Sequence, residues 1–79
     1  MVLFIDKHEM GSITPEKLHE LVNEPKDEFG VLHKELLYNK DEDTVMCILD
    51  APSKEAVMKH HEKYGIKPDW TYEVKSAKD

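Results

Sequence analysis

Potential metal ligands recur at alternate positions near the start of the chain, in the stretch FIDKHEM. If this stretch is a strand, Asp6, His8 and Met10 point to one side, because successive side chains of a strand alternate between its two faces. Carboxylate, imidazole and thioether groups suit nickel, copper or zinc better than calcium or magnesium. Gly11 follows at once, so the strand should end before Met10 can join the other two. Asp6 and His8 are candidate ligands; otherwise Asp6 pairs with a lysine and His8 lies at a solvated strand end.

Cysteine and histidine add candidates further along the chain. Cys47 belongs to an expected strand, where it could supply a soft ligand or be no more than a small buried hydrophobe. His60 and His61 are adjacent in an expected helix, where neighbouring side chains diverge by about 100° and rarely bind one ion. We expect one of them to be a structural histidine with a hydrogen-bond partner and the other to be exposed. His33 and Glu35 share a face of another expected strand, for which a polar exposed surface is the simpler explanation.

Familiar metal and phosphate motifs are absent from the sequence. There is no CxxC pair and no His-x-x-x-His pair, which excludes the common thiolate and helical metal signatures. No glycine-rich phosphate loop is present either. The acidic loop at 41–43 is too short for a calcium loop and lacks its glycine. None of these motifs therefore supports a metal or phosphate site.

The composition narrows the class of protein. A chain of 79 residues forms one domain, 1–79, and its formal net charge of −6 disfavours nucleic acid, whose partners need a basic surface. No apolar run approaches the roughly 20 residues of a membrane-spanning helix, and the N-terminus does not look like a signal peptide. A single cysteine excludes an intrachain disulfide. We expect a cytoplasmic protein that binds neither nucleic acid nor membranes.

The positions of apolar residues and of helix caps predict the elements that must hold these candidates. Thr14 and Ser53 can each cap a helix, and Pro15 suits a first helical position. Pro25 should end the first helix near Glu24. The expected strands are 2–8, 31–38, 44–50 and 69–75, and the expected helices are 14–24 and 54–64.

The order of these elements, β-α-β-β-α-β, predicts an α+β ferredoxin-like fold, with a four-stranded antiparallel sheet and both helices on one face. Right-handed crossovers make the first and third strands central, so the strand of Cys47 should lie beside that of Asp6. We expect the Asp6 carboxylate to lie on the open face of the sheet, where it needs a partner. The same open face could bind a second copy of this small chain, so we expect a homodimer.

Two stretches, LFIDKHEM and CILDAPSKEAVMKHHEKYGIKPDWTYEV, resemble a family of small domains of unknown function. That family includes dimeric nickel-binding proteins with a ferredoxin-like fold. The matching pattern is an acidic residue and a histidine on the first strand, a strand cysteine, Ala-Pro-Ser, a helical histidine and a glycine. The resemblance implies binding of nickel or another divalent transition metal by Asp6, His8, Cys47 and His60, with His61 as an additional histidine.

We therefore expect a small dimeric metal-binding protein that sequesters or senses nickel. One alternative is an enzyme similar to the dimeric α+β-barrel monooxygenases and isomerases. Such an enzyme would need a ligand-sized apolar cavity, with His8, His33 or Glu35 as acid or base. The other alternative is a purely structural dimerisation module whose histidines are incidental.

Overall fold

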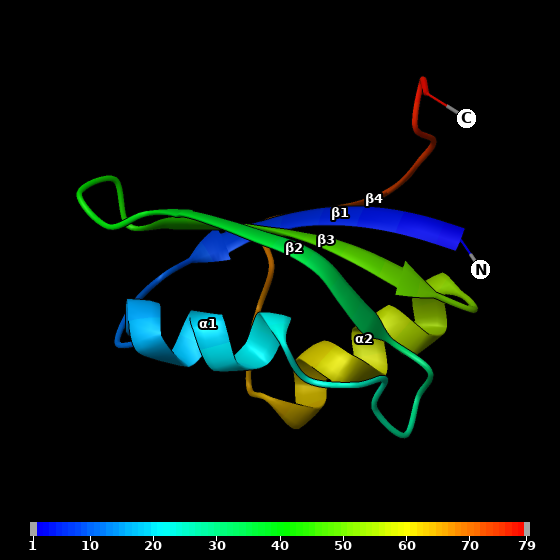
Figure 1. Ribbon diagram of the computed structural model, residues 1–79, viewed down its shortest axis with the longest axis horizontal. Helices are drawn as coiled ribbons and strands as arrows, with labels where there is room; N and C mark the ends of the chain where they lie inside the picture. The colour runs from blue at the N-terminus through cyan, green and yellow to red at the C-terminus, as the bar shows by residue number, and fades with distance from the viewer. Residues whose placement is uncertain (1, 79) are drawn as a thin grey trace.

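Six elements follow one another in the order β-α-β-β-α-β in the computed structural model, which describes residues 2–78 (Figure 1). Every predicted element is present, with its ends shifted by at most two residues. The strands are β1 (Val2–Glu9), β2 (Leu32–Asn39), β3 (Thr44–Ala51) and β4 (Trp70–Val74), and the helices are α1 (Pro15–Val22) and α2 (Lys54–Lys63).

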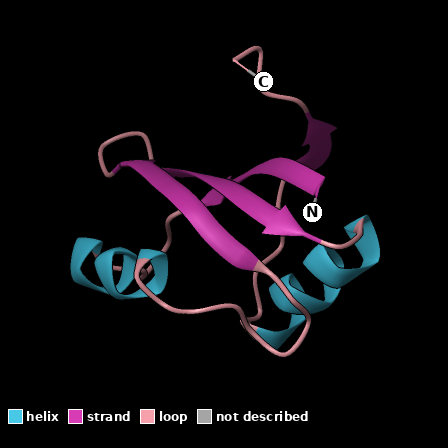
Figure 2. Cartoon of the chain, turned by 45° about the vertical axis from the view of Figure 1, so that its right-hand side comes forward, coloured by secondary structure: helices cyan, strands magenta, loops and turns pink. Residues whose placement is uncertain are grey.

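The four strands form one antiparallel sheet in the order β2-β3-β1-β4, with β1 and β3 in the centre. Both helices lie on the same side of this sheet, as Figures 1 and 2 show from two directions. The predicted ferredoxin-like fold is therefore confirmed. Among residues 2–78, no helix is long and apolar enough to cross a membrane.

Local capping sets the beginning of each helix. The hydroxyl of Thr14 accepts a hydrogen bond from the backbone N–H of Lys17, and Ser53 accepts one from Ala56. These contacts satisfy N–H groups that have no partner inside the helix. Beyond the end of α2, Gly65 has a φ of +66°, a left-handed conformation that glycine adopts without strain. The orientation of α2 on the sheet determines the positions of two candidate residues, His60 and His61.

The core lies between the sheet and the two helices. In β1, Phe4, Asp6 and His8 are buried and alternate with half-buried residues. In β3 the same alternation buries Val45 and Cys47. The candidate ligands of both central strands therefore face the helices. The expectation that Asp6 lies on the open face is wrong, because its side of β1 is the one that carries the core residue Phe4.

A bulge in β2 separates two residues that regular alternation would place together. His33 is paired with Leu49, whereas Glu35 is paired with Ile48, so Lys34 is an extra residue in the ladder. Leu49 is buried beneath the helices and Ile48 is half-buried on the other face. His33 therefore lies on the helix-covered face and Glu35 on the open face. The prediction that they share a face is wrong, because a one-residue insertion reverses the alternation.

The open face of the sheet is largely apolar. Leu37 and Tyr72, on the two outer strands, are 51% and 58% exposed. The rings of Trp70 and Tyr72 stack with centroids 5.0 Å apart. Between them, the two central strands contribute half-buried side chains: Leu3, Ile5, Met46 and Ile48.

Candidate metal centre

Asp6 carries a carboxylate that is fully buried near the middle of β1, with 0% of the residue exposed. Neither oxygen has a hydrogen-bond partner among the residues that the structure describes. A buried carboxylate without compensation is costly, because it loses hydration and gains nothing in return. The Asp6 side chain therefore needs a cation or a proton.

His61, on α2, is the basic group beside this carboxylate. Its Nε2 lies 2.8 Å from Oδ2 of Asp6, and its side chain is also buried. The contact is close enough for an ion pair, but it does not have the geometry of a hydrogen bond. His61 is a charge partner for the carboxylate only when its ring is protonated. The nitrogen and the oxygen are about as far apart as two neighbouring ligand atoms on one metal ion, which is about 3 Å for bonds of about 2.1 Å.

His8 is held in one tautomer. Its Nδ1 lies 2.7 Å from the backbone carbonyl oxygen of Glu9, which can only accept, so Nδ1 carries the proton. In the neutral ring Nε2 then has a free lone pair, and it lies 3.5 Å from Sγ of Cys47. A backbone carbonyl that orients an imidazole in this way is a common feature of histidine ligands to metals.

Cys47 is the direct cross-strand partner of Asp6 in the pairing of β1 with β3. Its thiol is free and buried. Burial raises the pKa of this thiol well above its ordinary value, and the negative charge of Asp6 raises it further. Without a cation the sulfur therefore keeps its proton. A bound metal would displace that proton, because thiolate is the form that binds metals.

The ligand atoms of Asp6, His8 and Cys47 lie within 4.8 Å of one another. Together they offer one oxygen, one nitrogen and one sulfur, a mixed set that suits a borderline transition metal rather than calcium or magnesium. The uncompensated carboxylate supplies the charge that a divalent cation needs. The residues present could therefore hold a metal ion.

A small cavity of about 20 Å³ lies beside this group, between the sheet and the helices. Its volume suffices for a single ion or water molecule, whereas pockets for small-molecule ligands usually measure about 300–1,000 Å³. Four of the five histidines of the chain line it. The polar lining residues are His8, His33, Cys47, His60 and His61.

A larger surface cleft, of about 520 Å³, reaches His8 from the outside. It lies between the loop that follows β1 and the loop that follows α2, and both His8 and Ile66 border it as well as the inner cavity. His8 therefore lies between the solvent in this cleft and the buried group.

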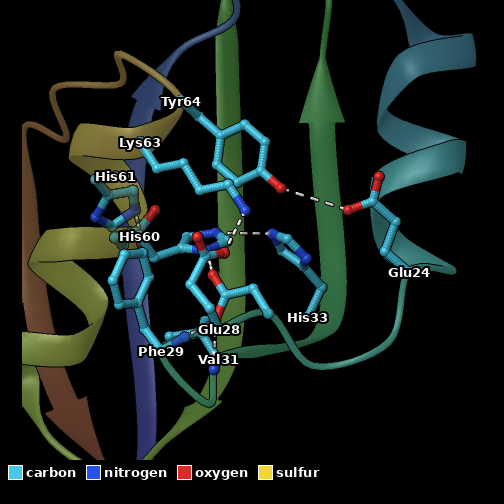
Figure 3. A network of polar contacts seen from close by, with 11 residues as sticks. Glu24, Glu28, Phe29, Val31, His33, His60, His61, Lys63 and Tyr64 are labelled. Atoms are coloured by element: carbon cyan, nitrogen blue, oxygen red, sulfur yellow. Dashed lines mark hydrogen bonds and ion pairs between the residues drawn. The ribbon is translucent and has the colours of Figure 1, made fainter.

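His60 lies outside the group formed by Asp6, His8 and Cys47. Its Nδ1 lies 2.6 Å from Oδ2 of Asp27, and its Nε2 lies 3.3 Å from Nε2 of His33 (Figure 3). The sequence prediction grouped His60 with the other ligands, and its role as a ligand stays a prediction.

Both adjacent histidines of α2 are buried, His60 at 3% and His61 at 5% exposed. The expectation that one of them is exposed is wrong. Their divergence is nonetheless as expected, because His61 contacts Asp6 of β1 whereas His60 contacts Asp27 and His33. One turn of α2 therefore contributes to two polar groups: His61 with Asp6, and His60 with Asp27 and His33.

Two partners were not assigned from the sequence. The resemblance gives His61 only as an additional histidine, and the spacing of apolar residues does not fix the rotation of a helix against a sheet. Asp27 was not singled out at all, since it lies in the loop between α1 and β2. Its position after Pro25 and before Gly30 is typical of a turn and carries no signal for a histidine partner.

Comparisons with known proteins identify a family and a structure with a similar fold. The family model described as nickel responsive protein SCO4226-like matches residues 4–74. The crystal structure of SCO4226 from Streptomyces coelicolor A3(2) is similar to this chain, with 29% sequence identity and a TM-score of 0.76. The match covers 95% of this chain and 98% of that chain. No curated protein matches the chain.

Proposed function

The chain belongs to the SCO4226-like family of nickel-responsive proteins, and from this membership we propose that it binds a divalent transition metal, nickel first, for sequestration or sensing. The ligands that we assign are Asp6, His8 and Cys47. Their mixed oxygen, nitrogen and sulfur atoms suit nickel, and the family description names the same metal.

The observation that carries the proposal is the carboxylate of Asp6. It is fully buried, and no described residue donates a hydrogen bond to it. A structural role would be served as well or better by an apolar residue, because a buried ion pair such as that of Asp6 with His61 often adds nothing to stability once desolvation is counted. Binding of a cation would compensate the charge of the buried carboxylate and so explain its position in the core.

Each residue has a distinct task in this proposal. Asp6 provides charge, and His8 presents a lone pair that the carbonyl of Glu9 keeps available. Cys47 provides a soft ligand once its proton has left. His61 lies against Asp6 and either orients that carboxylate or joins it on the ion.

We also propose a homodimer formed through the open face of the sheet. The exposed Leu37 and Tyr72 and the half-buried Ile5 and Ile48 support a self-complementary apolar surface on a chain whose own core is small. A cytoplasmic location is part of the same proposal, because reducing conditions keep the only cysteine, Cys47, available as a ligand.

Isothermal titration of nickel into protein without a histidine tag tests the metal proposal. We expect one ion to bind tightly through the assigned ligands, and a His8→Ala, Cys47→Ala double variant to lose that binding. His19→Ala is the matched control, because His19 is exposed on α1 and does not border the cavity. If the double variant binds as many nickel ions as wild type and the control do, and as tightly, the assignment is refuted.

A further inference from the structure

A second histidine pair lies beside the contact between His61 and Asp6. Nε2 of His60 and Nε2 of His33 face each other at 3.3 Å, and the rings meet edge to face with centroids 4.9 Å apart. Figure 3 shows His33 reaching toward His60 from β2, with the Tyr64 hydroxyl and Glu24 in a contact above them. This polar group is separate from the contact between His61 and Asp6.

Asp27 fixes the orientation of His60. Its Oδ1 accepts hydrogen bonds from the backbone N–H groups of Phe29 and Val31, at 2.9 and 3.0 Å, which leaves Oδ2 for Nδ1 of His60. Burial opposes ionisation of Asp27, but the hydrogen bonds from His60 and from the two amides outweigh it and lower the pKa of the carboxyl. An ionised carboxylate only accepts, so His60 carries its proton on Nδ1. Its Nε2 then accepts a hydrogen bond from the Nε2–H of His33.

His33 is prepared to act as a second nitrogen ligand. Burial lowers the pKa of its imidazole, and the neighbouring His60 lowers it further. In the metal-free protein the proton of His33 is on Nε2, which donates to His60, so binding of an ion between the rings requires this proton to move to Nδ1. Two imidazole nitrogens bound to one tetrahedral ion, at about 2.0–2.1 Å each, lie about 3.3 Å apart. The observed separation of the two Nε2 atoms is 3.3 Å.

We propose that His33 and His60 bind a second divalent transition-metal ion between their Nε2 atoms, and that Asp27 is the positioning residue that holds His60 in place. Carboxylate, imidazole and metal in this order form a common arrangement in metalloproteins. Because the site offers nitrogen and no sulfur, it suits copper(II), nickel(II) or zinc(II). His33 is half-buried, so water completes the coordination.

The two sites are distinct although they share α2. His60 and His61 have ring centroids 5.8 Å apart and contact different partners. Both histidines border the cavity of about 20 Å³, which has room for one ion, so a second ion must take the place of the hydrogen bond between His33 and His60. A single ion shared by all the histidines is therefore the opposing arrangement that an experiment must exclude.

Counting bound ions separates the two arrangements. With protein that lacks a histidine tag, we expect calorimetry and elemental analysis to give two nickel or zinc ions per chain. His33→Ala should reduce the count to one, and Asp6→Asn should remove the other ion instead. The control His19→Ala should keep both. His33 lies on an outer strand and is half-buried, so its substitution leaves the core intact, as circular dichroism can verify.

A second variant tests the positioning role. Asp27→Asn should weaken the second ion by about 10- to 100-fold without changing the first, the usual effect of removing a carboxylate behind a histidine ligand. Two ions retained in His33→Ala would overturn the second site. One ion in wild type, lost in both His33→Ala and Asp6→Asn, would overturn it in favour of a shared site. Loss confined to His33→Ala would instead refute the proposed Asp6 centre.

Discussion

Asp6 and Cys47 are direct partners across the pairing of β1 with β3, so a carboxylate and a thiol lie side by side in the buried centre of the sheet. Neither is a usual choice for that position. The carboxylate lacks hydrogen-bond donors, and its charge helps to keep the thiol protonated. A bound metal ion would compensate the carboxylate and displace the proton of the thiol. Two apolar residues at these positions would need no such compensation.

Replacing Asp6 with asparagine should separate stability from metal binding. Without metal, we expect Asp6→Asn to raise the free energy of unfolding by about 1 kcal/mol or more, because it removes a buried charge whose contact with His61 lacks the geometry of a hydrogen bond. With nickel the order should reverse, since the variant loses a ligand. Urea unfolding with chelator and with nickel measures both values.

The matched control for that experiment is Asp50→Asn. Asp50 lies on the open face of β3 and forms an ion pair with Lys34 at 3.6 Å. Its substitution should change stability by less than about 0.5 kcal/mol, with or without nickel. A metal-free Asp6→Asn that is markedly less stable than wild type would show that the carboxylate is structural.

Nickel should stabilise the wild-type protein through mass action. At a free concentration of about 100 times Kd, one site adds about 2.7 kcal/mol to the free energy of unfolding. Cys47→Ala should abolish most of this gain. Differential scanning calorimetry should show a higher Tm with nickel, reversed by a chelator. An equal rise in Cys47→Ala would exclude the thiol as a ligand.

The Asp27–His60 pair should make the metal-free protein sensitive to acid. The pKa of Asp27 lies below its ordinary value of 3.8 in the folded state. Because the folded pKa is the lower one, the ionised carboxylate stabilises the fold above the unfolded pKa, and this contribution is lost as pH falls through the folded value. We expect the difference in unfolding free energy between wild type and Asp27→Asn to be largest above about pH 5.

Urea unfolding at a series of pH values from about 6 to 3, with chelator present, measures that difference. Asp41→Asn, in the exposed loop between β2 and β3, is the control and should show no comparable dependence. A difference for Asp27→Asn that stays constant down to the lowest pH would contradict the lowered pKa.

A charge in the open face of the sheet should prevent self-association. Ile48→Glu places a carboxylate in the centre of that apolar surface, where an interface between two copies would bury it at a cost of several kcal/mol. We expect analytical ultracentrifugation to show a dimer for wild type and a monomer for this variant. Met58→Glu makes the same change at an exposed position on α2, away from the sheet face, and should leave the dimer intact. A wild-type monomer would refute the interface.

Much of the fold could be predicted because local signals are strong. Thr14 and Pro15 mark the start of α1 and Ser53 that of α2, while the alternation in β3 marks a strand with one buried face. The handedness of crossovers then makes β1 and β3 neighbours. That argument alone placed Cys47 next to the strand of Asp6.

The rest depends on interactions that sequence spacing does not encode. Both sides of β1 carry apolar residues, Phe4 on one and Ile5 on the other, so the side that meets the helices is decided by packing. The partners of His60 and His61 depend on how α2 is rotated on the sheet. Asp27 becomes a partner only because its loop passes beside α2.

The second histidine pair, His33 and His60, depends on the one-residue bulge at Lys34. His33 reaches the interior because one additional residue shifts the alternation of β2. Loss of a single codon there would turn His33 outward and leave every core residue of β1 and β3 unchanged. The second pair could therefore be gained or lost through this one insertion, without any change in the residues that form the Asp6 centre.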